Sequence, residues 1–223
     1  MLKKTEVSGL STSLMQLHDI TGTIRFGVPL AQAAGAVILL HGRGSSADDI
    51  AGLAKAMKGA SLAFLAPNAS GGAWYPQRFF APLPHNEPWL SSALGVIDQL
   101  VKEVQAAGIP FERIGLAGFS QGACLCLEYV VRNPRRYGFV AGLSGSLIGP
   151  LDTLRPVANL EKTPTLVACA KNDAHIPLAF VEKSAAKFAS FNAEVTNQLF
   201  LGGAHTVFDE EIAWLRQQVS DWK

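Results

Sequence analysis

Short apolar runs alternate along this chain with segments of helical period, and no other feature constrains the fold as strongly. Six runs have the length and composition of buried strands, namely residues 35–40, 61–66, 113–118, 138–145, 164–170 and 193–200. Most are apolar throughout, which is typical of strands covered on both faces. The alternation therefore predicts an α/β fold with a mostly parallel central sheet and helices on both faces.

Four other segments carry apolar residues at helical spacing. The residues are Ile50, Leu53, Ala54 and Met57; Leu94, Ile97, Val101 and Val104; Val181, Ala185 and Phe188; and Ile212, Leu215, Val219 and Trp222. The second helix should stop at Gly108, with Pro110 beyond it. The last should begin with a capping box between Thr206 and Asp209, and its acidic first turn complements the helix dipole.

Length and charge narrow the class of protein. A chain of 223 residues with 48% hydrophobic residues can bury roughly 70% of its unfolded surface in one core, so a single domain over residues 1–223 is expected. The formal net charge is +1, and the lysines and arginines are scattered. A nucleic-acid partner and an anionic membrane surface are therefore not expected.

The N-terminal stretch and the cysteines indicate in which cellular compartment the protein resides. Residues 1–16 contain two lysines but no apolar stretch of secretory-signal length, and no later run is long enough to span a membrane. Cys124, Cys126 and Cys169 lie in apolar surroundings, so buried reduced thiols are expected, not a disulfide or a metal site. The sequence thus predicts a soluble, cytoplasmic protein and leaves open whether it forms a homodimer.

Candidate functional residues follow the predicted strands, because ligand sites in such sheets lie beyond the carboxyl ends of the strands. Ser120 follows the run 113–118, Asp173 follows 164–170, and His205 follows 193–200. Their order along the chain is Ser, Asp, His. This order, together with a serine between two glycines, fits the G-x-S-x-G nucleophile elbow of serine hydrolases.

The motif requires glycine on both sides of the serine for a steric reason. A turn from strand to helix this tight gives Ser120 a strained backbone, and side chains at Gly118 and Gly122 would collide with their neighbours. The turn also brings the serine hydroxyl to a helix N-terminus, where free N–H groups favour the negative charge that develops during acyl transfer.

The assignments of the acid and the base each have a competitor. Asp173 could merely cap a turn, but the preceding strand offers only Asp152, several residues beyond its end. His205 is preferred as the base because it follows a late strand and the flexible pair Gly202-Gly203. Of the other histidines, His41 is expected to be a hydrogen-bonded structural residue, His175 is expected to be a loop residue beside the acid, and His18 and His85 are weaker candidates.

The chain from about Ile24 to Trp222 resembles the small cap-less α/β-hydrolases of the phospholipase/carboxylesterase family, which includes acyl-protein thioesterases and lysophospholipases. The matching stretches are LLHGRGSSADD, GFSQG, NDAHIP and GGAHTVFDEE. The resemblance implies an α/β-hydrolase fold without a separate cap domain, with Ser120, Asp173 and His205 as catalytic triad. It also implies an oxyanion hole formed by the backbone N–H groups of Arg43 and Gln121. That of Gln121 is independently expected, because this residue directly follows the nucleophile.

The segment 66–92 departs from many thioesterases of this family. It contains about twenty residues without regular period and the aromatic residues Trp74, Tyr75, Phe79, Phe80 and Trp89. These side chains could simply pack the segment onto the core. Taken together they favour an apolar acyl or aryl pocket, with Trp74 and Tyr75 as first candidates for substrate binding. Hydrolysis of small esters is therefore favoured over protein thioesterase activity.

The predicted activity is that of a serine carboxylesterase acting on small carboxylic or thio esters through an acyl-enzyme. Lysophospholipase and acyl-protein thioesterase activity are the alternatives. No cofactor is required, and no metal-ligand spacing such as C-x-x-C is present. A rival from another class is a non-catalytic ligand-binding homologue on the same scaffold. A cysteine-based hydrolase is disfavoured, because serine occupies the elbow and Cys124 should face the core.

Overall fold

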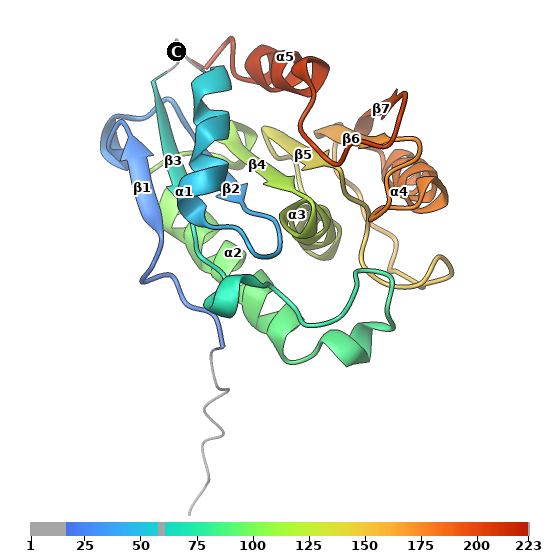
Figure 1. Cartoon of the computed structure of the whole chain (residues 1–223). Helices are drawn as coiled ribbons and strands as arrows, with labels where there is room; N and C mark the ends of the chain where they lie inside the picture. Colours follow the sequence, from blue (N-terminus) through green and yellow to red (C-terminus); the bar gives the residue numbers. More distant parts are fainter. Residues whose placement is uncertain (1–16, 58–60, 223) are drawn as a thin grey trace, which may run out of the picture.

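All six predicted strands form, and their bounds differ from the sequence prediction by at most two residues. The computed structural model describes residues 17–57 and 61–222. Its strands are β1 (Ile24–Gly27), β2 (Gly35–Leu40), β3 (Leu62–Ala66), β4 (Ile114–Phe119), β5 (Phe139–Leu143), β6 (Pro164–Ala170) and β7 (Glu194–Phe200). They form one sheet in the order β1-β3-β2-β4-β5-β6-β7, in which β2 to β7 are mutually parallel (Figure 1).

The short strand β1 was missed by the sequence analysis. It pairs antiparallel with β3 at the edge of the sheet, with Ile24 opposite Ala66. Its side chains alternate between half-buried and exposed, because only one face of this edge strand packs on the core. Four residues with two apolar side chains give too weak an alternating pattern to predict a strand.

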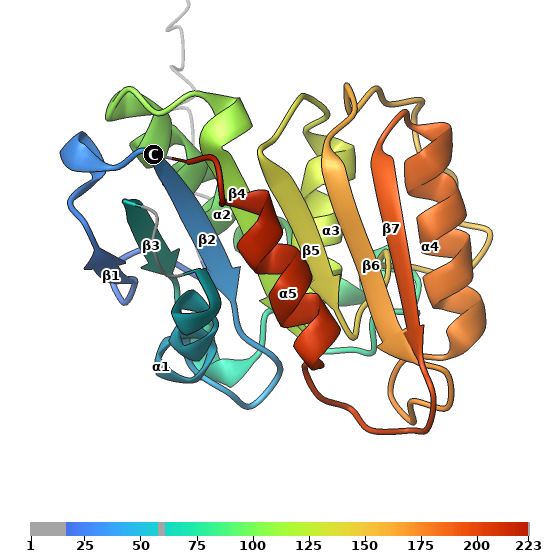
Figure 2. The ribbon, with the colours of Figure 1, turned by 90° about the horizontal axis from the view of Figure 1, so that it is seen from above.

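The helices cover both faces of the sheet, as the strand composition predicts. They are α1 (Ala47–Ile50, continued by a 3₁₀ segment Ala51–Met57), α2 (Trp89–Ala106), α3 (Gln121–Arg132), α4 (Leu178–Ser190) and α5 (Asp209–Gln218). The apolar faces of α1 and α5 pack on one side of the sheet, while α2, α3 and α4 pack on the other. Figure 2 shows α1 and α5 in front of the strands, with α2 and α3 behind them.

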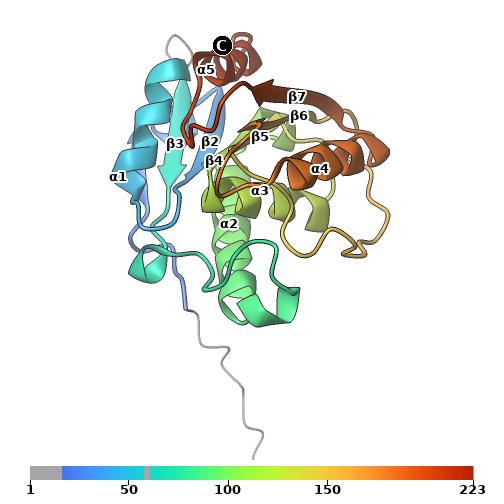
Figure 3. The same cartoon turned by 45° about the vertical axis from the view of Figure 1, so that its right-hand side comes forward.

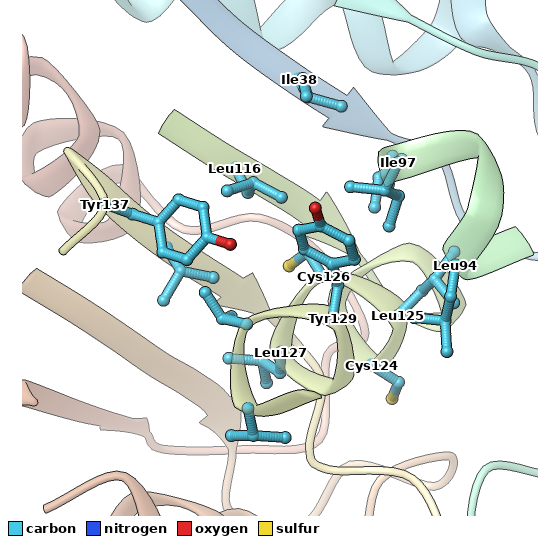
Figure 4. Close-up of a cluster of buried hydrophobic side chains, with 14 of the residues drawn as sticks. Ile38, Leu94, Ile97, Leu116, Cys124, Leu125, Cys126, Leu127, Tyr129 and Tyr137 are labelled. Carbon is cyan, nitrogen blue, oxygen red and sulfur yellow. The ribbon is translucent and has the colours of Figure 1, made fainter. Parts of the chain in front are cut away.

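The helix α3 lies at the centre of the larger core cluster. All of its residues from Gln121 to Val131 are buried. Figure 4 shows Leu125 of this helix near Leu94 and Ile97 of α2, on the side of the sheet that holds the larger cluster. Since α3 follows directly from β4, the residue between them is held by a rigid, fully packed unit.

The carboxyl ends of the parallel strands meet at one edge of the sheet. In Figure 2 the arrowheads of β2, β6 and β7 point to this edge, where the chain after β7 crosses to α5. The register places Leu40 opposite Gly118 and Ala170 opposite Phe200. The segments that follow β2, β4, β6 and β7 therefore begin at the same level, which is the arrangement that a shared site at the strand ends requires.

The start of α5 corrects one local prediction. The capping box between Thr206 and Asp209 does not form; instead the helix begins one residue after Phe208, whose N–H donates to Oε2 of Glu211 at 2.6 Å. The acidic first turn is present as predicted. The sequence analysis placed the cap two residues too early, because a threonine followed at the right spacing by an acid also fits a helix start that the chain does not use.

The cysteines match the sequence prediction. Cys124, Cys126 and Cys169 are buried and unpaired. No helix in residues 17–57 or 61–222 combines the length and apolarity that crossing a bilayer requires. The prediction about the N-terminal stretch 1–16 lies outside the described residues.

Candidate active site

The turn between β4 and α3 has the strained geometry that the G-x-S-x-G motif predicts. Ser120 adopts φ 54° and ψ −114°, a conformation that residues other than glycine rarely occupy. A Cβ at Gly118 would lie 2.3 Å from the carbonyl oxygen of Gly122, and one at Gly122 would lie 2.1 Å from that of Leu40. Both glycines are thus required by close backbone contact, and the turn leaves the Ser120 hydroxyl at the N-terminus of α3.

Three side chains far apart in the sequence meet at this turn. Nε2 of His205 lies 2.9 Å from Oγ of Ser120, and Nδ1 of the same ring lies 2.6 Å from Oδ2 of Asp173. With Nδ1 protonated, the ring donates to the carboxylate and its Nε2 accepts from the serine hydroxyl. The structure therefore brings together the three residues that the sequence analysis selected, in hydrogen-bond contact.

The carboxylate of Asp173 is buried but well supplied with donors. Its side chain is fully buried, and Oδ1 accepts hydrogen bonds from the backbone N–H groups of His175 at 2.7 Å and Ile176 at 3.1 Å. Burial alone would raise its pKa, but the hydrogen bonds from His205 and from these two amides outweigh burial and hold the pKa below its ordinary value. Asp173 is consequently ionised at neutral pH and can stabilise a positive charge on His205.

The loop that carries His205 is fixed by contacts with two other strand ends. The carbonyl of Gly202 accepts a hydrogen bond from the N–H of Asn172, next to the acid. Farther along, the carbonyl of Thr206 accepts from the hydroxyl of Ser144 at 3.3 Å. Gly202 has φ 91°, so glycine is needed here for a left-handed conformation.

Two backbone N–H groups belong to residues that line the same cavity as Ser120. Gln121 begins α3, and the first N–H groups of a helix have no acceptor within it. The chain after β2 runs beside the elbow, since a Cβ on Gly42 would lie 3.5 Å from Cβ of Ser120, and Arg43 follows directly. No acceptor in the described residues binds the N–H of Arg43. Both groups are therefore free to donate to a ligand oxygen held near Ser120.

Side chains of these same residues hold the segment 66–92 in place. Oε1 of Gln121 accepts from the N–H of Trp74 at 2.9 Å, while its Nε2 donates to the carbonyl of Tyr75 at 2.8 Å. Nη2 of Arg43 donates to the carbonyls of Tyr75 and Gln77, at 2.7 and 2.8 Å. Figure 3 shows this segment, in teal and green, between α1 and the start of α2. The sequence analysis did not foresee these side-chain roles.

A cavity of about 490 Å³ opens at Ser120 and His205. Tyr75 lines it, as expected, but Trp74 does not: its side chain is fully buried, and its indole N–H donates to the carbonyl of His41 at 2.9 Å. The choice of Trp74 as a substrate contact is thus corrected. Period and composition could not reveal this, because the direction of each aromatic ring depends on hydrogen bonds to distant parts of the chain.

Further residues of the cavity wall were not singled out as ligand contacts. Phe79 lines the cavity and also stacks edge to face with Phe180 of α4, so it both packs the segment and shapes the wall. Ile176 and Arg78 line it as well. Cys124 is buried in the core as predicted but also forms part of the cavity wall, one helical turn beyond Ser120. Its burial raises the pKa of the thiol to about 11, so it is not a thiolate at neutral pH.

The other histidines lie as the sequence analysis expected. His41 is fully buried, with Nδ1 donating to the carbonyl of Gly42 and Nε2 accepting from the N–H of Ala69. Burial lowers the pKa of its ring, which favours the neutral form that these two hydrogen bonds require. His175 lies beside the acid, with its ring centroid 4.7 Å from that of His205.

In residues 17–57 and 61–222 no three His, Cys, Asp or Glu side chains cluster as a metal site would require.

Comparison with known proteins identifies the family. The sequence model described as phospholipase/carboxylesterase matches residues 28–223. A crystal structure of a phospholipase/carboxylesterase from Dyadobacter fermentans DSM 18053 is 39% identical, with a TM-score of 0.85 over 92% of this chain and 98% of that one.

Two curated yeast proteins are similar over most of their length. Acyl-protein thioesterase 1 of Schizosaccharomyces pombe is 28% identical over 192 residues, which are 78% of this chain and 84% of the relative. Acyl-protein thioesterase 1 of Saccharomyces cerevisiae is 28% identical over 215 residues, 85% of this chain and 93% of the relative. With the family model matching nearly the whole chain, the protein belongs to the phospholipase/carboxylesterase family and is a carboxylic ester hydrolase of the α/β-hydrolase fold.

Proposed function

We propose that Ser120, His205 and Asp173 hydrolyse carboxylic esters in two steps through an acyl-enzyme. The observation that carries this proposal is the continuous chain of contacts from Oγ of Ser120 through the ring of His205 to Oδ2 of Asp173, at 2.9 and 2.6 Å. In this mechanism His205 takes the hydroxyl proton as the oxygen attacks the ester carbonyl. It then donates the proton to the leaving alcohol or thiol, and a water molecule repeats the cycle to release the acid.

The backbone N–H groups of Arg43 and Gln121 would bind the oxyanion. Both residues line the cavity at Ser120, Gln121 begins α3, and the N–H of Arg43 has no acceptor among the described residues, which supports this role. Donors held in advance toward the developing negative charge lower the barrier without reorganising in the transition state. Asp173 would hold the His205 ring with Nδ1 protonated and offset its transient positive charge.

Turnover of 4-nitrophenyl esters by Ser120→Ala and His205→Ala tests this mechanism. Each variant should lose about 10⁶ in kcat, because the members of a triad act as a unit. A Ser190→Ala variant, which removes an exposed hydroxyl at the end of α4, serves as a matched control for the loss of a serine. If Ser120→Ala retained turnover within about tenfold of the parent, the nucleophile would be a different group.

A protein thioester is a second candidate substrate, supported by the names of the two yeast relatives. A thioester and an oxygen ester with the same acyl group separate the two, since only the leaving atom differs. A higher kcat/KM for the thioester, retained when the thiol belongs to a cysteine of a peptide, is the result expected of a protein thioesterase. A preference for the oxygen ester would leave small-ester hydrolysis as the function.

A cytoplasmic location belongs to the same proposal. It is supported by three cysteines that are buried and unpaired, a pattern typical of reducing compartments. Fractionation of cells that express the full chain tests it, and sedimentation of the purified protein decides between a monomer and a homodimer.

A further inference from the structure

Among the described residues, the wall of the active-site cavity includes two arginines and no aspartate or glutamate. The two arginines are Arg43 and Arg78. Arg43 is held by the carbonyls of Tyr75 and Gln77, which satisfy hydrogen bonds but leave its charge in place. The Arg78 guanidinium has no hydrogen bond or ion pair with any residue in the described ranges; it lies over the ring of Phe80, with Cζ 5.7 Å from the centroid.

The carboxylates near this wall are already engaged. Glu128, which is buried and acts electrostatically on Tyr75 and Cys124, forms ion pairs with Arg132 at 2.8 Å and Arg155 at 2.7 Å. Asp173 is buried behind His205, with Oδ2 bonded to the ring and Oδ1 to two backbone amides. Asp49, in the first turn of α1, completes the capping box with Ser46 and accepts hydrogen bonds from the hydroxyls of Ser45 and Ser46. None of these carboxylates pairs with Arg78 or Arg43, so the positive charge of the wall has no ion-pair partner in residues 17–57 and 61–222.

A buried hydroxyl in the same wall has only a weak partner. Tyr75 is 1% exposed, and its Oη has no nitrogen or oxygen partner among the described residues, so that only the Cys124 thiol is close enough for a weak hydrogen bond. Buried hydroxyls in folded proteins are normally hydrogen-bonded. Burial also raises the pKa of this phenol, so that it stays protonated and can donate. The cavity thus offers a hydrogen-bond donor as well as a charge.

We propose that this cavity selects esters that carry an anionic group, a carboxylate or a phosphate, in addition to the ester bond. Arg78 supplies the charge that pairs with the anion, and the hydroxyl of Tyr75 donates a hydrogen bond to an oxygen of the same substrate. A volume of about 490 Å³ fits a small anionic ester of this kind. The inference rests on the proposed function, since it names the substrate class of that site.

Two matched pairs of esters test the preference and identify its source. Mono-4-nitrophenyl glutarate and 4-nitrophenyl pentanoate share a leaving group and an acyl carbon number, and only the first carries a carboxylate. 1-Butyrylglycerol 3-phosphate and 1-butyrylglycerol place a phosphate on the alcohol side. The measured quantity is the ratio of kcat/KM for the anionic ester to that for its neutral partner. We expect a ratio of about five to ten in at least one pair, and the pair that shows it identifies the anion.

Variants of Arg78 connect the preference to this residue. Arg78→Met should bring the ratio to about one, while Arg78→Lys should keep part of it because the charge remains. Lys102→Met, which removes an exposed positive charge on α2 outside the cavity lining, should leave the ratio as in the parent. High salt should lower the ratio in the parent but not in Arg78→Met. Tyr75→Phe should raise KM for the preferred anionic ester about fivefold, with the protein still folded, since phenylalanine keeps the packing of the ring and only a weak contact with the Cys124 thiol is lost.

Results that contradict the anion preference can be told apart from results that contradict the proposed esterase function. Ratios near one in both pairs, with all four esters turned over, would overturn the anion preference and leave the esterase mechanism intact. A ratio that persists in Arg78→Met would overturn the role of Arg78. If the parent hydrolysed none of the four esters, the proposed function itself would fail.

Discussion

The β4–α3 turn and the segment 66–92 border the same cavity but depend on different parts of the chain. At the turn the deciding contacts are mostly local: Gly118, Ser120 and Gly122 lie within five residues of one another. In the segment 66–92 the positions of Trp74 and Tyr75 depend on Gln121 and Arg43, which are more than 30 residues away.

This difference explains which site residues can be found from sequence. A strained turn requires particular residue types at fixed spacing, so it leaves a pattern in the sequence. A loop held by side chains from elsewhere can be built from many sequences, so its aromatic residues reveal that a wall exists but not which ring faces the cavity. The central chemistry is therefore predictable here, and the substrate contacts are not.

The largest predicted effect is the loss of activity when Asp173, part of the central chemistry, is replaced. Asp173→Asn should lower kcat by about 10⁴, by analogy with other triads, because the amide would bind the wrong tautomer of His205. His175→Gln, which changes the neighbouring loop residue, should lower kcat far less. Turnover of 4-nitrophenyl butyrate, with circular dichroism to verify folding, measures both. Equal losses in the two variants would mean that the loop, not the carboxylate, supports activity.

Gly122→Ala tests how closely the turn packs against the end of β2. A methyl group there would lie 2.1 Å from the carbonyl oxygen of Leu40, so the free energy of unfolding should fall by at least about 3 kcal/mol. Gly95→Ala in α2 is the matched control, since nothing lies within 4 Å of its Cβ. It should raise the free energy of unfolding by about 0.5–1 kcal/mol. Urea unfolding of both variants tests whether the free energy of unfolding falls in the first and rises in the second.

The pH dependence of stability tests the helix that follows the His205 loop. Burial raises the pKa of Glu211 to about 7, although the N–H of Phe208 partly offsets this. Between the unfolded value near 4.5 and about pH 7 the unfolded chain ionises while the folded protein does not. Stability from this group is therefore full below pH 4.5 and is lost as the pH rises, by at most about 3 kcal/mol.

Glu211→Gln removes this titration, so the difference in unfolding free energy between variant and parent should grow in favour of the variant from pH 4.5 to 7. Urea unfolding at a series of pH values measures it. A constant difference would mean that Glu211 is ionised in the folded protein throughout. Asp173 acts in the opposite sense and below this range, because its lowered pKa contributes stability that is lost only as the pH falls.

The smallest effect concerns the contacts that hold the segment 66–92. Gln121→Ala keeps the backbone N–H but removes both side-chain hydrogen bonds to Trp74 and Tyr75, so stability should fall by about 1–3 kcal/mol. KM should rise more than kcat falls, because Tyr75 and Arg78 lose their fixed positions on the wall. An equal loss in kcat with KM unchanged would show that the side chain serves the reacting atoms instead. Steady-state kinetics and urea unfolding separate the two.

The same reasoning explains which elements of the fold could be predicted from the sequence. The parallel strands are predictable because they are short, apolar throughout and bounded by turn residues, whereas β1 has only Ile24 and Phe26 on one half-buried face. The start of α5 was misplaced because Glu211, not Asp209, reaches back to the chain before the helix. Both wrong predictions concern positions where two local sequence patterns fit about equally well. Tertiary contacts decide there which structure forms.

The most direct test of the account is the site of covalent labelling by a fluorophosphonate, which reacts with an activated serine. Mass spectrometry of the labelled full chain should find one adduct, on the peptide that contains Ser120, and His205→Ala should label at least 10³-fold more slowly. An adduct on another residue, or ester turnover that continues in a protein that takes no label, would contradict the assignment of Ser120 as the nucleophile.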